Sequence, residues 1–176
     1  LNFNVAIISN TTLSANHAIT DGGAIYSAVT TYLENVTAIS NSATYGGNVY
    51  VQFPGGTDLR NSIIAGGLPT DCDSDNSSAT SLGHNIDSDN TCGLNYTGDQ
   101  PAVNPRLGPV RDNGGPGWTA ALLPGSPAID KGEDATCAAR DERGVSRYDG
   151  DHDGIIHCDV GAFEAGPMLY LPLIRR

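Results

Sequence analysis

Residues 33–50 read LENVTAISNSATYGGNVY, and this stretch decides the fold because the chain repeats it on both sides. Residues 8–26 carry the same succession of Asn, Asn, Gly-Gly and Tyr, and residues 59–67 repeat its first half. One asparagine marks the same position of each copy, 25 and then 26 residues apart, at Asn10, Asn35 and Asn61. A fixed period of this length, rich in Val, Ile, Thr and Tyr, is typical of stacked coils of short strands. The sequence therefore predicts an all-β fold: a right-handed parallel β-helix, or solenoid, with a loop-rich, disulfide-stapled C-terminal cap.

Each repeated position has an expected role in a coil. The paired glycines at 22–23 and 46–47 predict sharp corners, because glycine adopts backbone conformations that other residues avoid. The asparagines of the repeat are expected to stack about 4.8 Å apart in a hydrogen-bonded ladder that satisfies buried polar groups. The predicted interior stack is aliphatic and consists of Ile8, Leu13, Ile25, Leu33, Ile39, Val49, Leu59 and Ile63.

The chain divides into three sections. Residues 1–67 hold the coils, residues 68–117 a disulfide-containing continuation with loops, and residues 118–176 a cap with an Asp-rich loop and a terminal strand. Four cysteines form two local pairs without the CxxC spacing of a zinc or redox site, so we expect disulfides between Cys72 and Cys92 and between Cys137 and Cys158, although three connectivities are formally open. Disulfides persist in oxidising compartments, which predicts an extracellular or cell-surface location.

Charge and hydropathy narrow the range of partners. Nine Lys and Arg residues stand against 20 Asp and Glu residues, and the net charge of −11 disfavours binding to nucleic acid. No apolar run reaches the ~20 residues that span a bilayer. Leu1–Asn10 already resembles the middle of a repeat, so we expect further residues upstream of Leu1. Four sequons would accept N-linked glycans in a glycosylating pathway, at Asn10, Asn35, Asn76 and Asn95.

Alternating aspartates in the cap predict a structural calcium site. Asp149, Asp151 and Asp153 precede Gly154, as in the first half of an EF-hand loop, where alternate carboxylates converge on one ion. The twelfth position of such a loop is Val160, so we expect Asp159 and the Ile155 carbonyl to complete the ligand set. The competing interpretation is a solvated Asx turn.

Other polar residues receive plainer interpretations. Asp71, Asp73 and Asp75 form a second alternating triad without the glycine, and we expect them to be solvated. His152 and His157 flank the Asp-rich loop, but their spacing fits no settled transition-metal pattern and surface roles are expected.

The last apolar segment predicts self-association. Leu169, Tyr170, Leu171, Leu173 and Ile174 are too few to cross a membrane, and they could add as a strand to a neighbouring molecule. Repeated head-to-tail addition would give a filament. The alternative is that this segment folds back on its own solenoid.

Several phrases resemble a known family. They include Asp112-Asn-Gly-Gly-Pro116, Leu122-Leu-Pro-Gly-Ser-Pro-Ala-Ile-Asp130, Asp141-Glu-Arg-Gly144 and Cys158-Asp-Val-Gly-Ala-Phe-Glu164. In this order, across nearly the whole chain, they are similar to the C-terminal β-helix of bacterial choice-of-anchor Q surface proteins, and the coils resemble polymorphic outer-membrane-protein repeats. The resemblance implies a parallel β-helix on a secreted or surface-displayed protein and supplies no catalytic residues.

A structural or surface-interaction module is therefore the predicted function, with no enzyme activity, because the coils carry few charged residues and no convincing catalytic set. Two alternatives stay open. One is an adhesin that binds surface glycans through Tyr26, Tyr32, Tyr45 and Tyr50, and the other is a polysaccharide lyase or hydrolase of the β-helix class.

Overall fold

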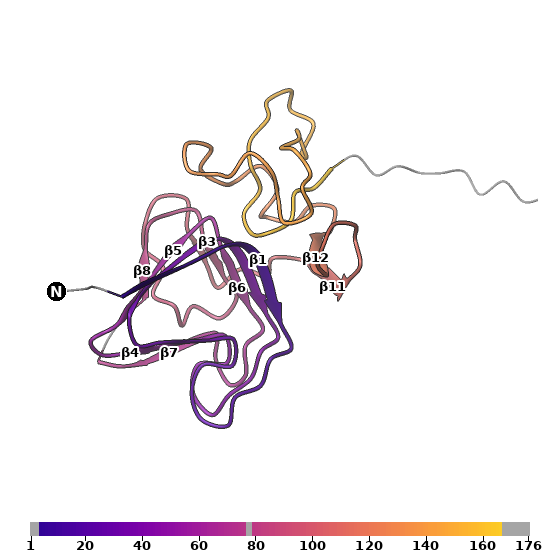
Figure 1. Cartoon of the computed structure of the whole chain (residues 1–176). Helices are drawn as coiled ribbons and strands as arrows, with labels where there is room; N and C mark the ends of the chain where they lie inside the picture. The colour runs from indigo at the N-terminus through magenta and orange to yellow at the C-terminus, as the bar shows by residue number, and fades with distance from the viewer. Residues whose placement is uncertain (1–3, 77–78, 167–176) are drawn as a thin grey trace, which may run out of the picture.

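The computed structural model describes residues 4–76 and 79–166, and this part of the chain contains strands, turns and loops but no α-helix (Figure 1). The coil strands are β1 (Val5–Ser14), β2 (Ile25–Ser27), β3 (Thr30–Ile39), β4 (Val49–Gln52), β5 (Gly56–Arg60), β6 (Ile63–Ala65), β7 (Cys72–Asp75), β8 (Ala79–Ser81), β9 (Ile86–Asp87) and β10 (Gln100–Pro101). β11 (Leu107–Arg111) and β12 (Thr119–Leu122) follow them.

The larger sheet is built by stacking successive coils in register. β1 pairs in parallel with β3 over its whole length, from Val5 opposite Thr30 to Ser14 opposite Ile39. The third coil continues this pairing as two shorter strands, β5 and β6, because the chain bends between them. β8 pairs with β5, β9 with β6, and β10 with β9.

A second parallel sheet closes the coil. It has the order β2-β4-β7 and places Ile25 beside Val49 and Val49 beside Cys72. Parallel strands joined by long connections, and paired at a separation of one repeat, are the hallmark of a solenoid. The predicted all-β parallel solenoid is confirmed, and it makes about three turns.

The paired glycines lie where neighbouring coils come closest. Gly22 and Gly46 have φ values of +62° and +57°, so each uses the left-handed conformation predicted for a corner. The next glycines serve a different need: a Cβ on Gly23 would lie 2.2 Å from the Gly47 carbonyl oxygen, and one on Gly47 would lie 2.2 Å from the Leu68 nitrogen. Only glycine allows the coils to approach this closely.

The interior of the solenoid is aliphatic. Five of the eight predicted interior residues are buried, namely Ile25, Leu33, Val49, Leu59 and Ile63. Ile8 and Leu13 of the first coil are only partly buried, because within the described part of the chain no coil covers the outer edge of β1. Ile39 is also partly buried.

The C-terminal section packs along the side of the solenoid. β11 and β12 form an antiparallel hairpin, and the described residues after it, 123–166, form loops. A second apolar cluster joins Ile63 and Ile86 of the coils to Leu122, Ala128, Val160 and Phe163. Both predicted disulfides are present, Cys72–Cys92 in the coils and Cys137–Cys158 in the C-terminal section.

Candidate functional site

One column of residues marks the bend of every coil. Asn10, Asn35 and Asn61 have φ values of 45°, 53° and 48°, and the strand register on either side places them one above another. His84, with φ 56°, lies at the equivalent bend of the next coil. Asparagine tolerates the left-handed conformation better than most residues, which explains its recurrence. We call Asn10, Asn35, Asn61 and His84 the bend column.

The bend column binds the C-terminal section instead of forming a ladder of side chains. Asn10 Nδ2 donates to the Arg140 carbonyl at 3.0 Å, and Asn35 Nδ2 donates to the Gly161 carbonyl at 3.4 Å. Asn61 Oδ1 accepts a hydrogen bond from Glu133 N at 2.8 Å. His84 Nδ1 lies 2.7 Å from the Lys131 carbonyl oxygen. The expected register of the asparagines is present, but the expected bonds between their side chains are replaced by bonds to residues 131–161.

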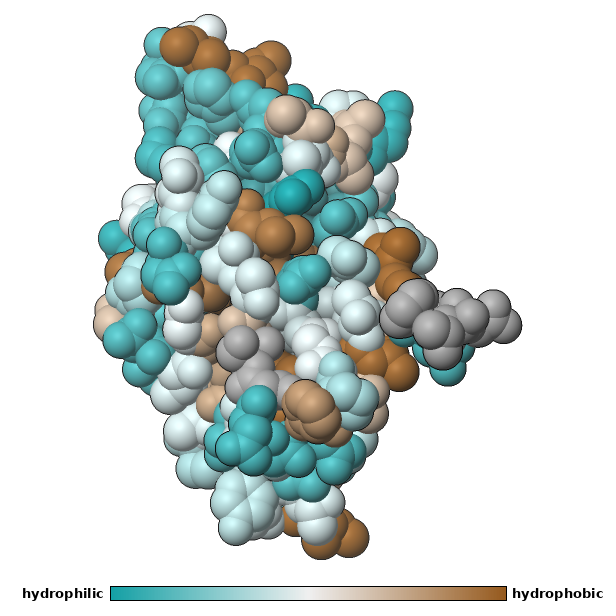
Figure 2. Space-filling view, turned by 90° about the vertical axis from the view of Figure 1, so that its left-hand side faces the viewer, coloured by the Kyte–Doolittle hydropathy of each residue, from teal (hydrophilic) through white to brown (hydrophobic). Residues whose placement is uncertain are grey.

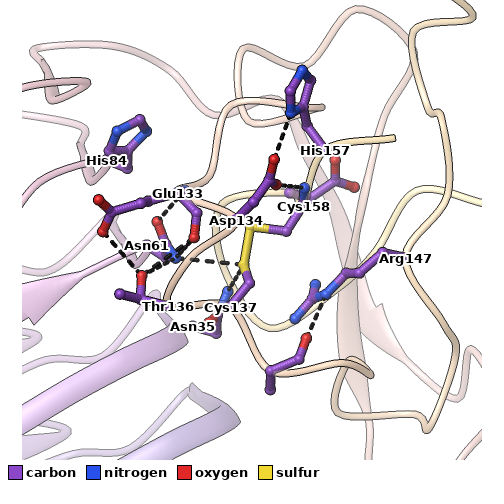
Figure 3. Close-up of a disulfide and its surroundings, with 12 residues drawn as sticks. Asn35, Asn61, His84, Glu133, Asp134, Thr136, Cys137, Arg147, His157 and Cys158 are labelled. Carbon is purple, nitrogen blue, oxygen red and sulfur yellow. Dashed lines mark hydrogen bonds and ion pairs between the residues drawn. A yellow bond between two sulfur atoms is a disulfide. The ribbon is translucent and has the colours of Figure 1, made fainter. Parts of the chain in front are cut away.

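The Cys137–Cys158 disulfide lies against this column (Figure 3). Asn35 Nδ2 and Asn61 Nδ2 both approach Cys137 Sγ, at 3.5 and 3.4 Å. On the other side of the disulfide, Asp134 accepts hydrogen bonds from Cys158 N at 2.8 Å and pairs with His157 Nδ1 at 2.7 Å. That hydrogen bond raises the pKa of His157. The disulfide therefore fixes the segment that the bend column holds.

Gly161 shows how close the contact is. Its nitrogen donates to the Asn61 carbonyl at 2.7 Å, and its φ is +95°. A Cβ at this position would lie 2.7 Å from Thr37 Oγ1 and 2.8 Å from Ile63 Cδ1. Glycine is therefore required for the C-terminal section to reach the coils here.

A second line of polar residues runs through the interior. Asn16 Nδ2 donates to Asn41 Oδ1 at 2.9 Å, Asn41 Nδ2 to Asn48 Oδ1 at 2.7 Å, and Asn48 Nδ2 to Asp71 Oδ1 at 2.7 Å. Ser88 Oγ donates to Asp71 Oδ2 at 2.5 Å. Asn41, Asn48 and Asp71 are completely buried. We call these five residues the buried amide chain, although Asn16 at one end is exposed and Ser88 at the other is partly buried. Side-chain hydrogen bonds of the kind predicted for Asn10, Asn35 and Asn61 occur here instead.

Asp71 also belongs to an acidic cluster. Its carboxylate lies near those of Asp87 and Asp89, with one oxygen of each within 4.8 Å of the others. Burial raises the pKa of Asp87 to about 7, although Asp89 N and Cys92 N donate to its two oxygens. Asp71 is thus buried, contrary to the solvated interpretation, whereas Asp73 and Asp75 on β7 are only partly buried and lie outside this cluster.

The Asp-rich loop forms a different cluster from the one predicted. Asp149 and Asp151 converge with Asp130, a residue that the sequence pattern does not single out, and one oxygen of each lies within 4.8 Å of the others. Asp153 is exposed and accepts a hydrogen bond from Ile155 N at 2.8 Å. Asp153 and Asp159 are not part of this cluster, which contains the predicted ligands Asp149 and Asp151. The role of the Ile155 carbonyl stays a prediction.

Asp159 has an enclosed structural position. Its Oδ1 accepts a hydrogen bond from Asp130 N at 2.7 Å, and burial together with the charge of Glu164 raises its pKa to about 8. Glu164, also completely buried, forms an ion pair with Arg147 at 2.7 Å. A second buried pair joins Asp141 to Arg143 at 2.7 Å, and the Arg143 guanidinium lies 3.5 Å from the centre of the Phe163 ring.

The remaining predicted site residues are dispersed. His152 is exposed and has an edge contact with Tyr148, and His17 lies 3.0 Å from Ser42 Oγ, so the described histidines do not converge on a metal. Of the sequons, Asn76 and Asn95 have exposed asparagines. Asn35 is 2 % exposed and bonded to the C-terminal section, so a glycan on its amide is incompatible with this fold.

The tyrosines lie mainly on the β2-β4 side, where Tyr26 and Tyr50 stack on each other with ring centroids 5.9 Å apart and planes at 4°. Tyr45 is 54 % exposed, and Tyr32 lies on β3 in the other sheet.

Among the cavities of the described surface, two have volumes of about 520 and 330 Å³. Arg60 and Tyr96 line the first, Ile39 and Leu107 the second, and neither is lined by a carboxylate. Glycoside hydrolysis needs two carboxylates across a bond, and these cavities do not supply them.

The predicted self-association residues Leu169, Tyr170, Leu171, Leu173 and Ile174 lie outside the described residues. Within residues 4–76 and 79–166, no helix has the length and apolarity to cross a membrane. No protein-family model, curated protein or solved structure matches the chain. The likeness to choice-of-anchor Q proteins therefore rests on the sequence phrases alone.

Proposed function

We propose that the chain is an extracellular structural module that self-associates by adding strands at the outer edge of β1. The carrying observation is the outer edge of β1, which no strand covers within residues 4–76 and 79–166. β1 is ten residues long and pairs with β3 alone among the described strands, and its own residues Ile8 and Leu13 are only partly buried. An unpaired edge over an unfinished apolar interior is a template for a further parallel strand.

The partner in this proposal is a second copy of the chain. Residues 168–174, MLYLPLI, supply an apolar segment that could serve as the added strand, with Pro172 restricting it to an edge. Figure 2 shows that, on the left-hand side of Figure 1, apolar residues form separate patches among hydrophilic ones. That face offers no single broad apolar area, and the β1 end is the better association surface.

The two disulfides support the extracellular part of the proposal, since such bonds persist in oxidising compartments. Glycan binding by the tyrosines is disfavoured, because Tyr26 and Tyr50 use one ring face each on the other.

Sedimentation of the full chain across micromolar to millimolar concentrations tests self-association. Ile8→Lys places a charge at the open interior and should abolish concentration-dependent assembly. Ile7→Lys is the matched control, because Ile7 directly precedes Ile8 in β1 and is 68 % exposed. This substitution should leave assembly unchanged. Deletion of residues 168–176 should also abolish assembly. A chain that stays monomeric throughout, or that assembles equally as Ile8→Lys, would overturn the proposal. Binding of the monomer to a glycan array, lost in Tyr26→Ala, would instead identify an adhesin.

A further inference from the structure

The Asp130, Asp149 and Asp151 cluster combines two distant segments of the C-terminal section. Asp130 ends the Ser126-Pro-Ala-Ile segment in a left-handed conformation with φ 54°, and it is 6 % exposed. Asp149 is partly buried and Asp151 is exposed. The cluster therefore has an enclosed base, formed by Asp130, and a side open to water at Asp151.

The carboxylate oxygens of this cluster are incompletely satisfied. Asp130 Oδ2 accepts a hydrogen bond from Asp151 N at 2.6 Å, and Asp149 Oδ2 accepts one from Gly154 N at 3.0 Å. Asp130 Oδ1 and Asp149 Oδ1 are both buried and have no hydrogen-bond partner. A buried carboxylate oxygen without a partner is costly, and native structures rarely leave one in that state.

The nearest cation does not fill this need. Lys131 Nζ lies 3.6 Å from Asp151 Oδ2, on the outer side of the cluster, and its side chain is 55 % exposed. It pairs with the most exposed of the three carboxylates. The two buried oxygens of Asp130 and Asp149 remain unpartnered.

The acidic cluster of the coils provides an internal comparison. There all six carboxylate oxygens accept hydrogen bonds from protein groups. The donors are Asn48, Gly67 and Ser88 to Asp71, Asp89 and Cys92 to Asp87, and Thr91 and Asp71 to Asp89. Every carboxylate oxygen of the coil cluster therefore has a protein partner without an ion. The two acidic clusters differ in whether they contain unpartnered buried oxygens, and not in how close their carboxylates lie.

We propose that Asp130, Asp149 and Asp151 bind a calcium ion. The cluster contains only carboxylates, the hard oxygen ligands that calcium prefers, and no histidine or cysteine that would favour zinc. The open side at Asp151 admits the waters that complete six to eight ligands, and a loop of this kind suits calcium better than the rigid octahedron of magnesium. The ion would tie the 149–154 loop to Asp130, whose backbone is held by buried Asp159. This proposal is independent of self-association.

Calcium titration of the full, disulfide-bonded chain after removal of metals tests the site, with calorimetry for binding and thermal unfolding for its effect. Calcium alone should bind saturably and raise Tm, because a ligand that binds only the folded state stabilises it. Asp149→Asn should weaken calcium affinity by about 10-fold or more through loss of one of three carboxylates. Asp130→Asn should do the same, but this residue is buried and bonded to Asp151 N, so Asp149→Asn is the decisive variant should the other fail to fold.

Asp153→Asn is the matched control, since Asp153 belongs to the same loop but lies outside the cluster. It should retain the calcium affinity and the Tm shift of the unmodified chain. No saturable heat at millimolar calcium would overturn the proposal. If calcium raised Tm equally in all variants, the rise would come from general charge screening, and this result would also overturn the proposal. Loss of binding in both Asp153→Asn and Asp149→Asn, with retention in a folded Asp130→Asn, would overturn the proposal in favour of the EF-hand-like arrangement.

Discussion

Replacing the side chain of Asn48 should measure how much the buried amide chain stabilises the solenoid. Asn48 is completely buried and its side chain makes three strong contacts, with Asn41 Nδ2 and Asp71 Oδ1 at 2.7 Å each and with the Ala65 carbonyl at 3.1 Å. A neutral hydrogen bond contributes about 1 kcal/mol and one to a carboxylate about 2 kcal/mol. Asn48→Ala should therefore lower the free energy of unfolding by about 4 kcal/mol, a large part of the 5–15 kcal/mol typical of a domain.

Asn16→Ala is the matched comparison. Asn16 lies at the exposed end of the same chain of residues. Its side-chain Nδ2 and its backbone nitrogen both donate to Asn41 Oδ1, at 2.9 and 2.8 Å. Loss of a single exposed hydrogen bond should cost about 0.5 kcal/mol. Urea denaturation of both variants with the disulfides intact measures the two free energies.

A cost for Asn48→Ala no greater than that for Asn16→Ala would refute the reasoning, because burial would then add nothing. Asn48→Asp provides a second measurement if the alanine variant is too unstable to compare. It places a carboxylate against Asp71, so its destabilisation should be greatest at neutral pH and should diminish under acidic conditions as one of the two acids becomes protonated.

Three further predictions concern the disulfide, the bend column and pH. Replacing Cys137 and Cys158 by serine should cost about 3 kcal/mol, from a loop of 21 residues, and an unchanged urea midpoint would contradict this. Asn61→Gly keeps the left-handed bend but removes the hydrogen bond with Glu133. Hydrogen exchange of the amides in residues 131–161 should therefore accelerate, while exchange in β3 stays slow. Equal acceleration in both would contradict the inference that Asn61 holds the C-terminal section. Burial raises the Asp87 pKa from 3.8 to about 7, so the stability it contributes is complete below pH 4 and is lost as the pH rises through 7. The Tm of the unmodified chain should therefore fall relative to the Tm of Asp87→Asn between pH 4 and 8. A difference in Tm that stays constant over this pH range would contradict the prediction.

The repeat was predictable from sequence because stacking imposes one requirement on every coil. Asn10, Asn35 and Asn61 recur because each bend needs a left-handed residue, and the paired glycines recur because corners and close coil contacts need them. The direction of the asparagine side chains was not predictable in the same way. It depends on a segment more than 70 residues later in the chain, which leaves no periodic signal in the coils.

The cluster of Asp130, Asp149 and Asp151 shows the same limit. Asp149 and Asp151 could be identified from local spacing, since alternate residues of one loop converge. Asp130 comes from a separate segment, and only the fold brings it beside them. Local spacing also favoured Asp153 and Asp159, but Asp153 bonds within its own loop and Asp159 turns inward to Asp130 N and Glu164. The recurrence of Asn16 and Asn41, 25 residues apart, is the sequence signal of the buried amide chain.

The bend column also limits how many coils can lie between Asn10 and His84. Open-ended solenoids gain or lose repeats freely, because each repeat contacts only its neighbours. Here one segment of fixed length, residues 131–161, reaches across the bends of four successive coils, from His84 to Asn10. Duplicating a coil between Asn35 and Asn61 would move Asn10 about 4.8 Å farther from the disulfide, beyond the reach of the Arg140 carbonyl. The length of the segment 131–161 therefore matches the number of coils between Asn10 and His84. Insertion of a repeat there would require a correspondingly longer segment in the C-terminal section.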